Sequence, residues 1–211
     1  MMILSTIKLT KRNLILCLAV LWACAGVSAE KQSTTESVGD LMRSGVSAEN
    51  SHRTADAAAA YEKLLQRDTT FEATVAPRLV NLYLSMNQSA PALSWATRVA
   101  RRHPAPKAYL AGVYARLGQH KEAELMLRQA ICNTPAAAQR VPLQWQLAEA
   151  QEHQGEEKAA EATLEQAYSS AKNNDLQKTS AQLLTALRKR LATRHAKQTA
   201  APRTPAEEET L

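Results

Sequence analysis

The stretch Lys107–Pro135, KAYLAGVYARLGQHKEAELMLRQAICNTP, predicts two short helices joined by a turn at Gly118. Apolar and small residues recur at helical spacing on both sides of this glycine, and Pro135 follows as a stop signal. The first set is Leu110, Ala111 and Tyr114, and the second is Ala123, Leu127, Ala130 and Ile131. The alanines would let the two helices approach closely, so the stretch predicts a helix-turn-helix unit.

The same pattern occurs before and after this stretch. The turn residues Asn87, Gly118 and Gly155 lie 31 and 37 residues apart. Asn, like Gly, tolerates the left-handed conformation that such a turn needs. One packing position differs, because Gln151 stands where the other units have Tyr83 and Tyr114. The matching stripes are Leu79, Val80, Ala92, Ala96, Val99 and Ala100 before the central unit, and Leu147, Ala148, Ala160, Leu164, Ala167 and Tyr168 after it.

These units resemble the tetratricopeptide repeat, a helix-turn-helix of about 34 residues. The resemblance covers roughly residues 55–171, and 37–46 with 54–68 are read as a degenerate first repeat with an extended turn. It implies an all-α protein, a tetratricopeptide-repeat-like α-solenoid of about four helix pairs. The helix expected from Asn174 to about His195 has one apolar and one polar face, which suits a C-terminal cap.

The chain divides into four predicted segments. Residues 1–29 are a signal peptide, 30–53 a flexible leader with a short, imperfect helix, 54–196 the repeat domain, and 197–211 a disordered tail. The third good unit is expected to begin after Pro142. The tail prediction follows from its prolines, its charges and its lack of any apolar period.

The N-terminal segment has the anatomy of an export signal. Three basic residues precede the apolar run 14–25, and Val27-Ser28-Ala29 forms a small-residue cleavage site. Leu21-Trp22-Ala23-Cys24 resembles a bacterial lipobox, in which Cys24 would be acylated. Two alternatives remain open: a periplasmic or secreted protein cleaved after Ala29, or a lipoprotein whose membrane association depends on Cys24 alone.

Charge and cysteine usage agree with export. Loss of Lys8, Lys11 and Arg12 with the signal lowers the formal net charge from +6 to +3, so we expect no nucleic-acid partner. Cys132 would be the only cysteine after residue 29, which excludes an internal disulfide framework there.

No motif predicts catalysis. The histidines are expected to stand singly, without metal-ligand spacing, and the glycines mark turns rather than a phosphate loop. We therefore expect no enzymatic activity, no cofactor and no metal site.

In the tetratricopeptide repeat family, the first helices of successive units line a concave groove that holds a peptide or a partner helix. The resemblance therefore implies a non-enzymatic interaction scaffold in the cell envelope, within a secretion, pilus or outer-membrane assembly. Trp145 is interpreted either as an anchor in the groove or as a contact between repeats, and the peptide-carboxylate clamp of some members is not expected because Pro77 occupies its first lysine position. The implied binding residues are Asn81, Leu84, Gly112, Arg116, Trp145 and Glu149.

An alternative function follows from two basic clusters near predicted helix ends. Cations there are favoured by the helix dipole, but they would also suit a module at a membrane or cell-wall surface. The clusters are Arg98, Arg101, Arg102, His103 and Lys107, and Arg188, Lys189, Arg190, Arg194 and Lys197.

Overall fold

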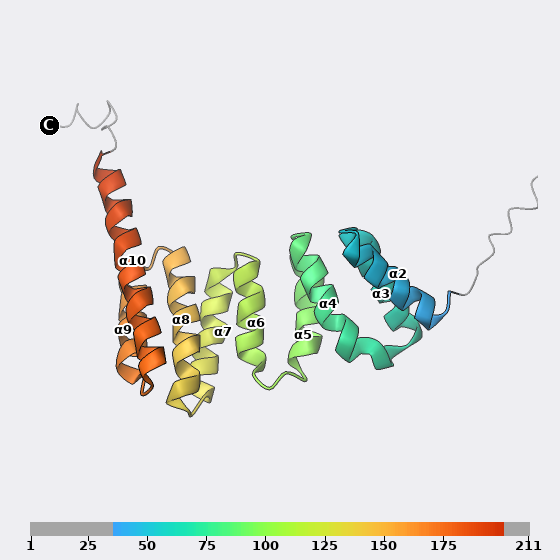
Figure 1. Ribbon diagram of the computed structural model, residues 1–211, viewed down its shortest axis with the longest axis horizontal. Coiled ribbons are helices and arrows are strands. Elements are labelled where there is room, and N and C mark those ends of the chain that lie inside the picture. The colour runs from blue at the N-terminus through green and yellow to red at the C-terminus, as the bar shows by residue number, and fades with distance from the viewer. Residues whose placement is uncertain (1–35, 201–211) are drawn as a thin grey trace, which may run out of the picture. The chain divides into compact units, whose positions relative to one another are not determined.

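The structure is a computed structural model that describes residues 36–200, with side chains to Lys197. The predicted signal peptide, Cys24 and the tail beyond residue 200 lie outside the described residues. Within them the chain is helical, without strands (Figure 1). The helices are α2 (Val38–Asn50), α3 (Thr54–Arg67), the 3-10 turn η1 (Thr69–Phe71), α4 (Glu72–Ser85), α5 (Ser89–Ala100), α6 (Pro106–Arg116), α7 (His120–Asn133), α8 (Ala137–His153), α9 (Glu157–Ser170) and α10 (Asn174–Ala200).

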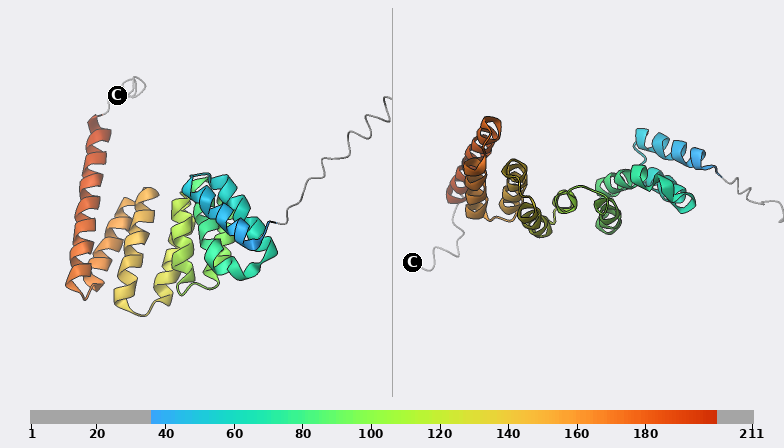
Figure 2. Two further views of the ribbon diagram at one scale, coloured as in Figure 1. Left: turned by 45° about the vertical axis from the view of Figure 1, so that its right-hand side comes forward. Right: turned by 90° about the horizontal axis from the view of Figure 1, so that it is seen from below.

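Successive helices pack as pairs. The short turns place α2 against α3, α4 against α5, α6 against α7 and α8 against α9, and α10 packs against α9 at the end (Figures 1 and 2). Each pair also contacts the next pair along the chain. The predicted all-α solenoid of four helix pairs and a C-terminal capping helix is confirmed. The compact unit that contains these pairs begins at Val38.

Alanine is the most frequent residue among the buried apolar side chains. Alanines on the second helix of each pair are fully buried, and leucines fill the space beside them. The apolar residues form several clusters along the chain rather than one central core. Stability is therefore expected to come from contacts between neighbouring helices. The fully buried alanines are Ala57, Ala92, Ala96, Ala123, Ala160 and Ala167.

The turns inside the pairs share one geometry. Asn87, Gly118 and Gly155 have φ angles of 55°, 72° and 79°, as the sequence predicts. In each turn the N–H of the residue that follows donates to the carbonyl five positions before it. A carbonyl at the helix end that lacks a partner within the helix is thereby hydrogen-bonded. The expected extended turn in the first pair is wrong, because His52 takes the same left-handed conformation, with φ 55°, and Arg53 N–H donates to Ala48 at 2.9 Å.

Helix α2 is longer than expected and is packed closely. Its glycines suggested an imperfect helix over 37–46, but it continues to Asn50. Gly45 lies against the fully buried ring of Tyr61 in α3. The Tyr61 hydroxyl donates to Glu49 Oε2 at 2.7 Å, and burial together with this bond raises the pKa of Tyr61 to about 12. Gly45 therefore serves close approach rather than helix termination.

Two further positions differ from the expectation. Helix α8 begins at Ala137 and contains Pro142, so the third unit starts earlier than predicted. A proline in a helix removes one backbone hydrogen bond, and here the packed neighbour Val141, fully buried, helps to hold the helix across it. Tyr168 was expected in the packed stripe, but 42% of it is exposed.

Gln151 is buried at the position where the two preceding units have a tyrosine. Its side chain is 1% exposed. In the orientation that satisfies its amide, the nitrogen donates to Thr163 Oγ1 at 2.8 Å and to the carbonyl of Ala159 at 3.2 Å, and the oxygen accepts from Arg128. Hydrogen bonds to α9 thus replace an aromatic contact.

Candidate interaction groove

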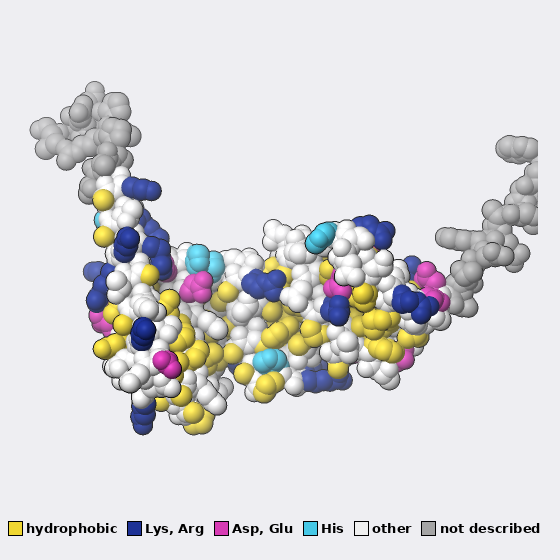
Figure 3. Space-filling view, viewed as in Figure 1, with side chains coloured by type: hydrophobic (Ala, Val, Ile, Leu, Met, Phe, Trp, Pro, Cys, Tyr) yellow, Lys and Arg dark blue, Asp and Glu magenta, His cyan; other side chains and the backbone are white. Residues whose placement is uncertain are grey.

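A cavity of about 650 Å³ lies along the first helices of three successive pairs, α4, α6 and α8. We call it the central groove. Its floor and walls are mainly small and apolar, and Figure 3 shows apolar surface exposed between scattered charges. Four of the six predicted binding residues line this one cavity, although they are spread over 69 residues of sequence. These four are Asn81, Gly112, Arg116 and Glu149.

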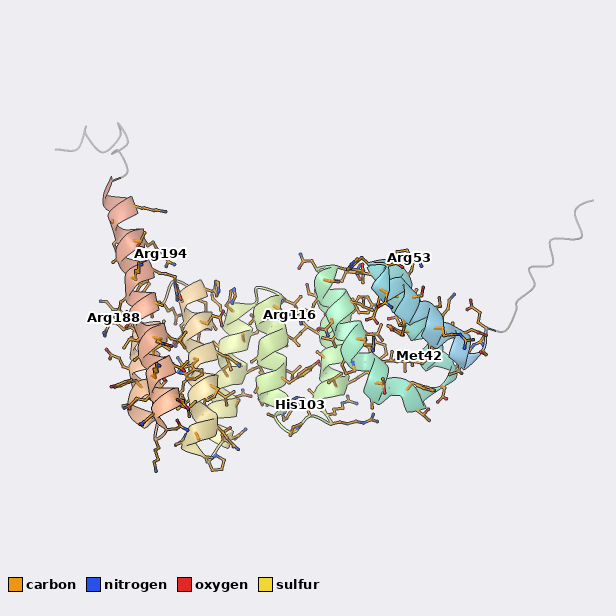
Figure 4. All side chains as sticks on the ribbon, viewed as in Figure 1. Met42, Arg53, His103, Arg116, Arg188 and Arg194 are labelled. Carbon is orange, nitrogen blue, oxygen red and sulfur yellow. The ribbon has the colours of Figure 1, made fainter. Side chains whose placement is uncertain are left out.

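The rim of the central groove carries polar groups. Arg116, at the end of α6, is exposed, and its Nη1 donates to Asn81 Oδ1 of α4 at 2.8 Å (Figure 4). Among the described residues, no carboxylate forms an ion pair with Arg116, and no cation forms one with the exposed Glu149 of α8. The groove thus presents one cation and one carboxylate that do not neutralise each other.

Small residues leave space in the middle of the groove. A Cβ atom added to Gly112 would meet nothing within 4 Å, outside the backbone of its own helix. Ala108 and Ala111 lie beside it in the lining of the same cavity. This space can receive the side chains of another chain, and a large residue at position 112 would fill it.

A pair of histidines also lines the central groove. We expected the histidines to stand singly, and for His120 and His153 this is wrong: their rings stack with centroids 4.4 Å apart and an interplanar angle of 9°. His120 begins α7 and His153 ends α8, so only the packing of two helix pairs brings them together. Within residues 36–200 no group of three His, Cys, Asp or Glu side chains could hold a metal ion.

A second cavity, of about 580 Å³, lies between α8, α9 and α10. It shares Gln146, Glu149 and His153 with the central groove, so the two cavities adjoin along α8. Trp145 lines this second cavity instead of the central groove. The other predicted residue, Leu84, lines neither cavity, and it packs against the apolar clusters around α4 and α5.

Trp145 contacts the capping helix. Its Nε1 donates to Ser180 Oγ of α10 at 2.9 Å, and its half-buried ring packs against buried residues of two apolar clusters that include Leu187 and Ala167. Of the two interpretations of Trp145, the structure places it in a helix-to-helix contact, with one side on the second cavity.

Ion pairs tie α10 to the helices before it. Glu152 of α8 accepts two hydrogen bonds from Arg190, at 2.8 and 2.6 Å, and this contact holds the pKa of the carboxyl below its usual range. Arg194 pairs with Glu157 at 2.9 Å, and Arg188 contacts Glu161 and Glu165 of α9. Three arginines of the second basic cluster are therefore bound to carboxylates, and two of them, Arg188 and Arg194, are labelled on α10 in Figure 4. This neutralisation weighs against a polyanion-binding role for that cluster.

We expect Glu152→Gln to lower the free energy of unfolding by about 1 kcal/mol at pH 7, because it removes a charged hydrogen-bonded pair. The folded-state pKa of Glu152 lies below its unfolded value, so the carboxylate stabilises the fold above about pH 4.3, and this contribution disappears as pH falls through the folded pKa. Urea midpoints of the two proteins should therefore converge as the pH falls through the folded-state pKa of Glu152. Glu156→Gln, at an exposed position, is the control; a constant difference across pH would contradict the assignment.

Other features of the described residues add little chemistry. Cys132 is exposed and has a free thiol. Between residues 36 and 200, no helix combines the length and the apolar character needed to cross a membrane.

The fold and the groove define a helical-repeat protein, a class whose stacked helix pairs create extended binding surfaces. In a comparison with known proteins, residues 141–174, which cover most of α8 and all of α9, match the family model described as tetratricopeptide repeat. Such repeats are in general protein-interaction scaffolds rather than catalysts. No curated protein matches the chain.

Solved structures are similar to this chain at low sequence identity. A crystal structure of MamA is 14% identical, with 72% of this chain and 96% of that chain covered and a TM-score of 0.45. A crystal structure of MamA protein is also 14% identical, with 82% and 100% covered and a TM-score of 0.47. A tetratricopeptide repeat protein from Parabacteroides merdae ATCC 43184 is 15% identical, with 83% and 80% covered and a TM-score of 0.39.

Proposed function

We propose that this protein is a non-enzymatic scaffold of the bacterial cell envelope and that its central groove binds a segment of a partner protein. The observation that carries the proposal is the 650 Å³ cavity along α4, α6 and α8, with open space at Gly112 and polar groups at its rim. Cavities of this size, mostly apolar with a few placed polar groups, suit side chains of a ligand.

The envelope location rests on the N-terminal sequence. The basic residues, apolar run and small-residue site of residues 1–29 favour export, and Cys24 is the candidate for acylation. A role within a secretion, pilus or outer-membrane assembly is consistent with an exported interaction module. The mass of the mature N-terminus, measured by mass spectrometry, distinguishes cleavage before Glu30 from acylation of Cys24.

Site-specific photo-crosslinking in the native host tests the groove. A benzoylphenylalanine introduced at Ala115, an exposed residue of α6 in the lining of the central groove, should yield a discrete adduct with another protein. The matched control is the same residue at Leu125 of α7, which is 54% exposed and lines none of the cavities described above. Adducts at Leu125 alone, or equal adducts at both positions, would refute groove binding.

A further inference from the structure

The charges around the central groove fall into two groups. Glu152, Arg190 and Arg194 lie at the second cavity and are bound to one another or to Glu157. Arg116 and Glu149 line the central groove, and among the described residues neither has an ion-pair partner. Of the five Arg and Glu side chains that line the two cavities, three are thus paired within the protein, whereas Arg116 and Glu149 are not.

The two unpaired charges are held in place by different helices. Arg116 ends α6 and is oriented by its hydrogen bond to Asn81 of α4. Glu149 lies on α8, and Arg190, which interacts with it electrostatically, donates two hydrogen bonds to Glu152. Arg190 could therefore neutralise Glu149 only by giving up its hydrogen bonds to Glu152.

We propose, on the basis of the proposed function, that the central groove selects a polypeptide segment carrying both an acidic side chain, for Arg116, and a basic side chain, for Glu149, around a small apolar centre. Opposite charges set the partner's register and exclude segments of a single charge sign, because like charges brought together at an interface cost several kcal/mol. A nucleic acid or an anionic lipid surface would meet Glu149 as a repulsive group, which favours a protein partner.

A random twelve-residue peptide library displayed on phage tests this specificity. Selection on the immobilised wild-type protein should enrich peptides with at least one acidic and one basic residue, whose binding is lost in Gly112→Trp and kept in Leu125→Trp. Arg116→Glu or Glu149→Arg should weaken each selected peptide by about tenfold or more. The double variant should recover binding of the same peptides synthesised with their acidic and basic residues exchanged.

The possible results separate this inference from the proposed function. Peptides that are sensitive to Gly112→Trp but indifferent to both charge reversals would overturn the charge selection and leave groove binding intact. The absence of any peptide sensitive to Gly112→Trp would overturn both. Peptides of one charge sign that bind the wild-type groove would likewise overturn the selection of a mixed-charge segment.

Discussion

Gly45→Ala is expected to lower the free energy of unfolding by about 2 kcal/mol, although alanine is the better helix former. The added Cβ would lie 2.4 Å from Cε1, 2.7 Å from Cδ1 and 2.9 Å from Cζ of Tyr61. The ring cannot move aside easily, because it is fully buried and its hydroxyl is bound to Glu49. Urea unfolding followed by circular dichroism measures the loss.

The matched control is the same substitution at another helical glycine. Gly112 of α6 has open space where its Cβ would lie, so Gly112→Ala should stabilise the protein by up to about 1 kcal/mol. A loss of stability for Gly45→Ala and a gain for Gly112→Ala would separate the effect of packing from that of helix propensity. In a Tyr61→Leu background the cost of Gly45→Ala should fall, because its clash partner is gone. An unchanged cost there, or a stabilising Gly45→Ala, would show that α2 does not pack on Tyr61 as described.

Trp145→Ala is expected to cost about 3 kcal/mol and to loosen the C-terminal end of the repeat stack first. The substitution removes the ring that joins α8 to the clusters around Leu187 and Ala167, together with the hydrogen bond to Ser180. In a repeat protein each unit contacts only its neighbours, so the loss should be local. Hydrogen exchange should therefore accelerate in α9 and α10 while α2–α5 stay protected.

Trp145→Phe is the control for the ring contact. It keeps most of the apolar ring, and Ser180 Oγ still donates to the carbonyl of Leu176 at 2.8 Å, so the cost should be about 1 kcal/mol. Equal acceleration of exchange over all helices in Trp145→Ala would contradict the local role. If Trp145→Ala also weakens binding, the hydrogen exchange of α10 must be measured first. Only a defect that occurs without faster exchange in α10 can be assigned to a lost contact with the ligand.

The interaction groove was largely accessible to sequence reasoning. The repeat phase predicts Asn81, Gly112, Arg116 and Glu149 as groove residues, and all four line the central groove. Helical periodicity explains this, because a repeat that stacks in phase carries equivalent positions of its first helices to the same face. Whether these residues bind a partner stays a prediction.

Trp145 and Leu84 show the limit of that reasoning. The repeat phase places a residue on a helix face but does not say what covers that face. At Trp145 the capping helix α10 supplies the covering partner through Ser180, and at Leu84 the clusters around α4 and α5 do so. The end of a repeat array differs from its middle, since its last unit meets a helix of another kind.

By itself, the sequence determined the local features of this protein: the helix period, the left-handed turns at Asn87, Gly118 and Gly155, and the alanine stripes that let helices pair. Only the tertiary structure decided which distant side chains meet. The His120–His153 stack joins residues 33 positions apart and the Glu152–Arg190 pair joins residues 38 apart. Periodicity is encoded within one helix, whereas such contacts depend on the positions that several packed helices adopt together.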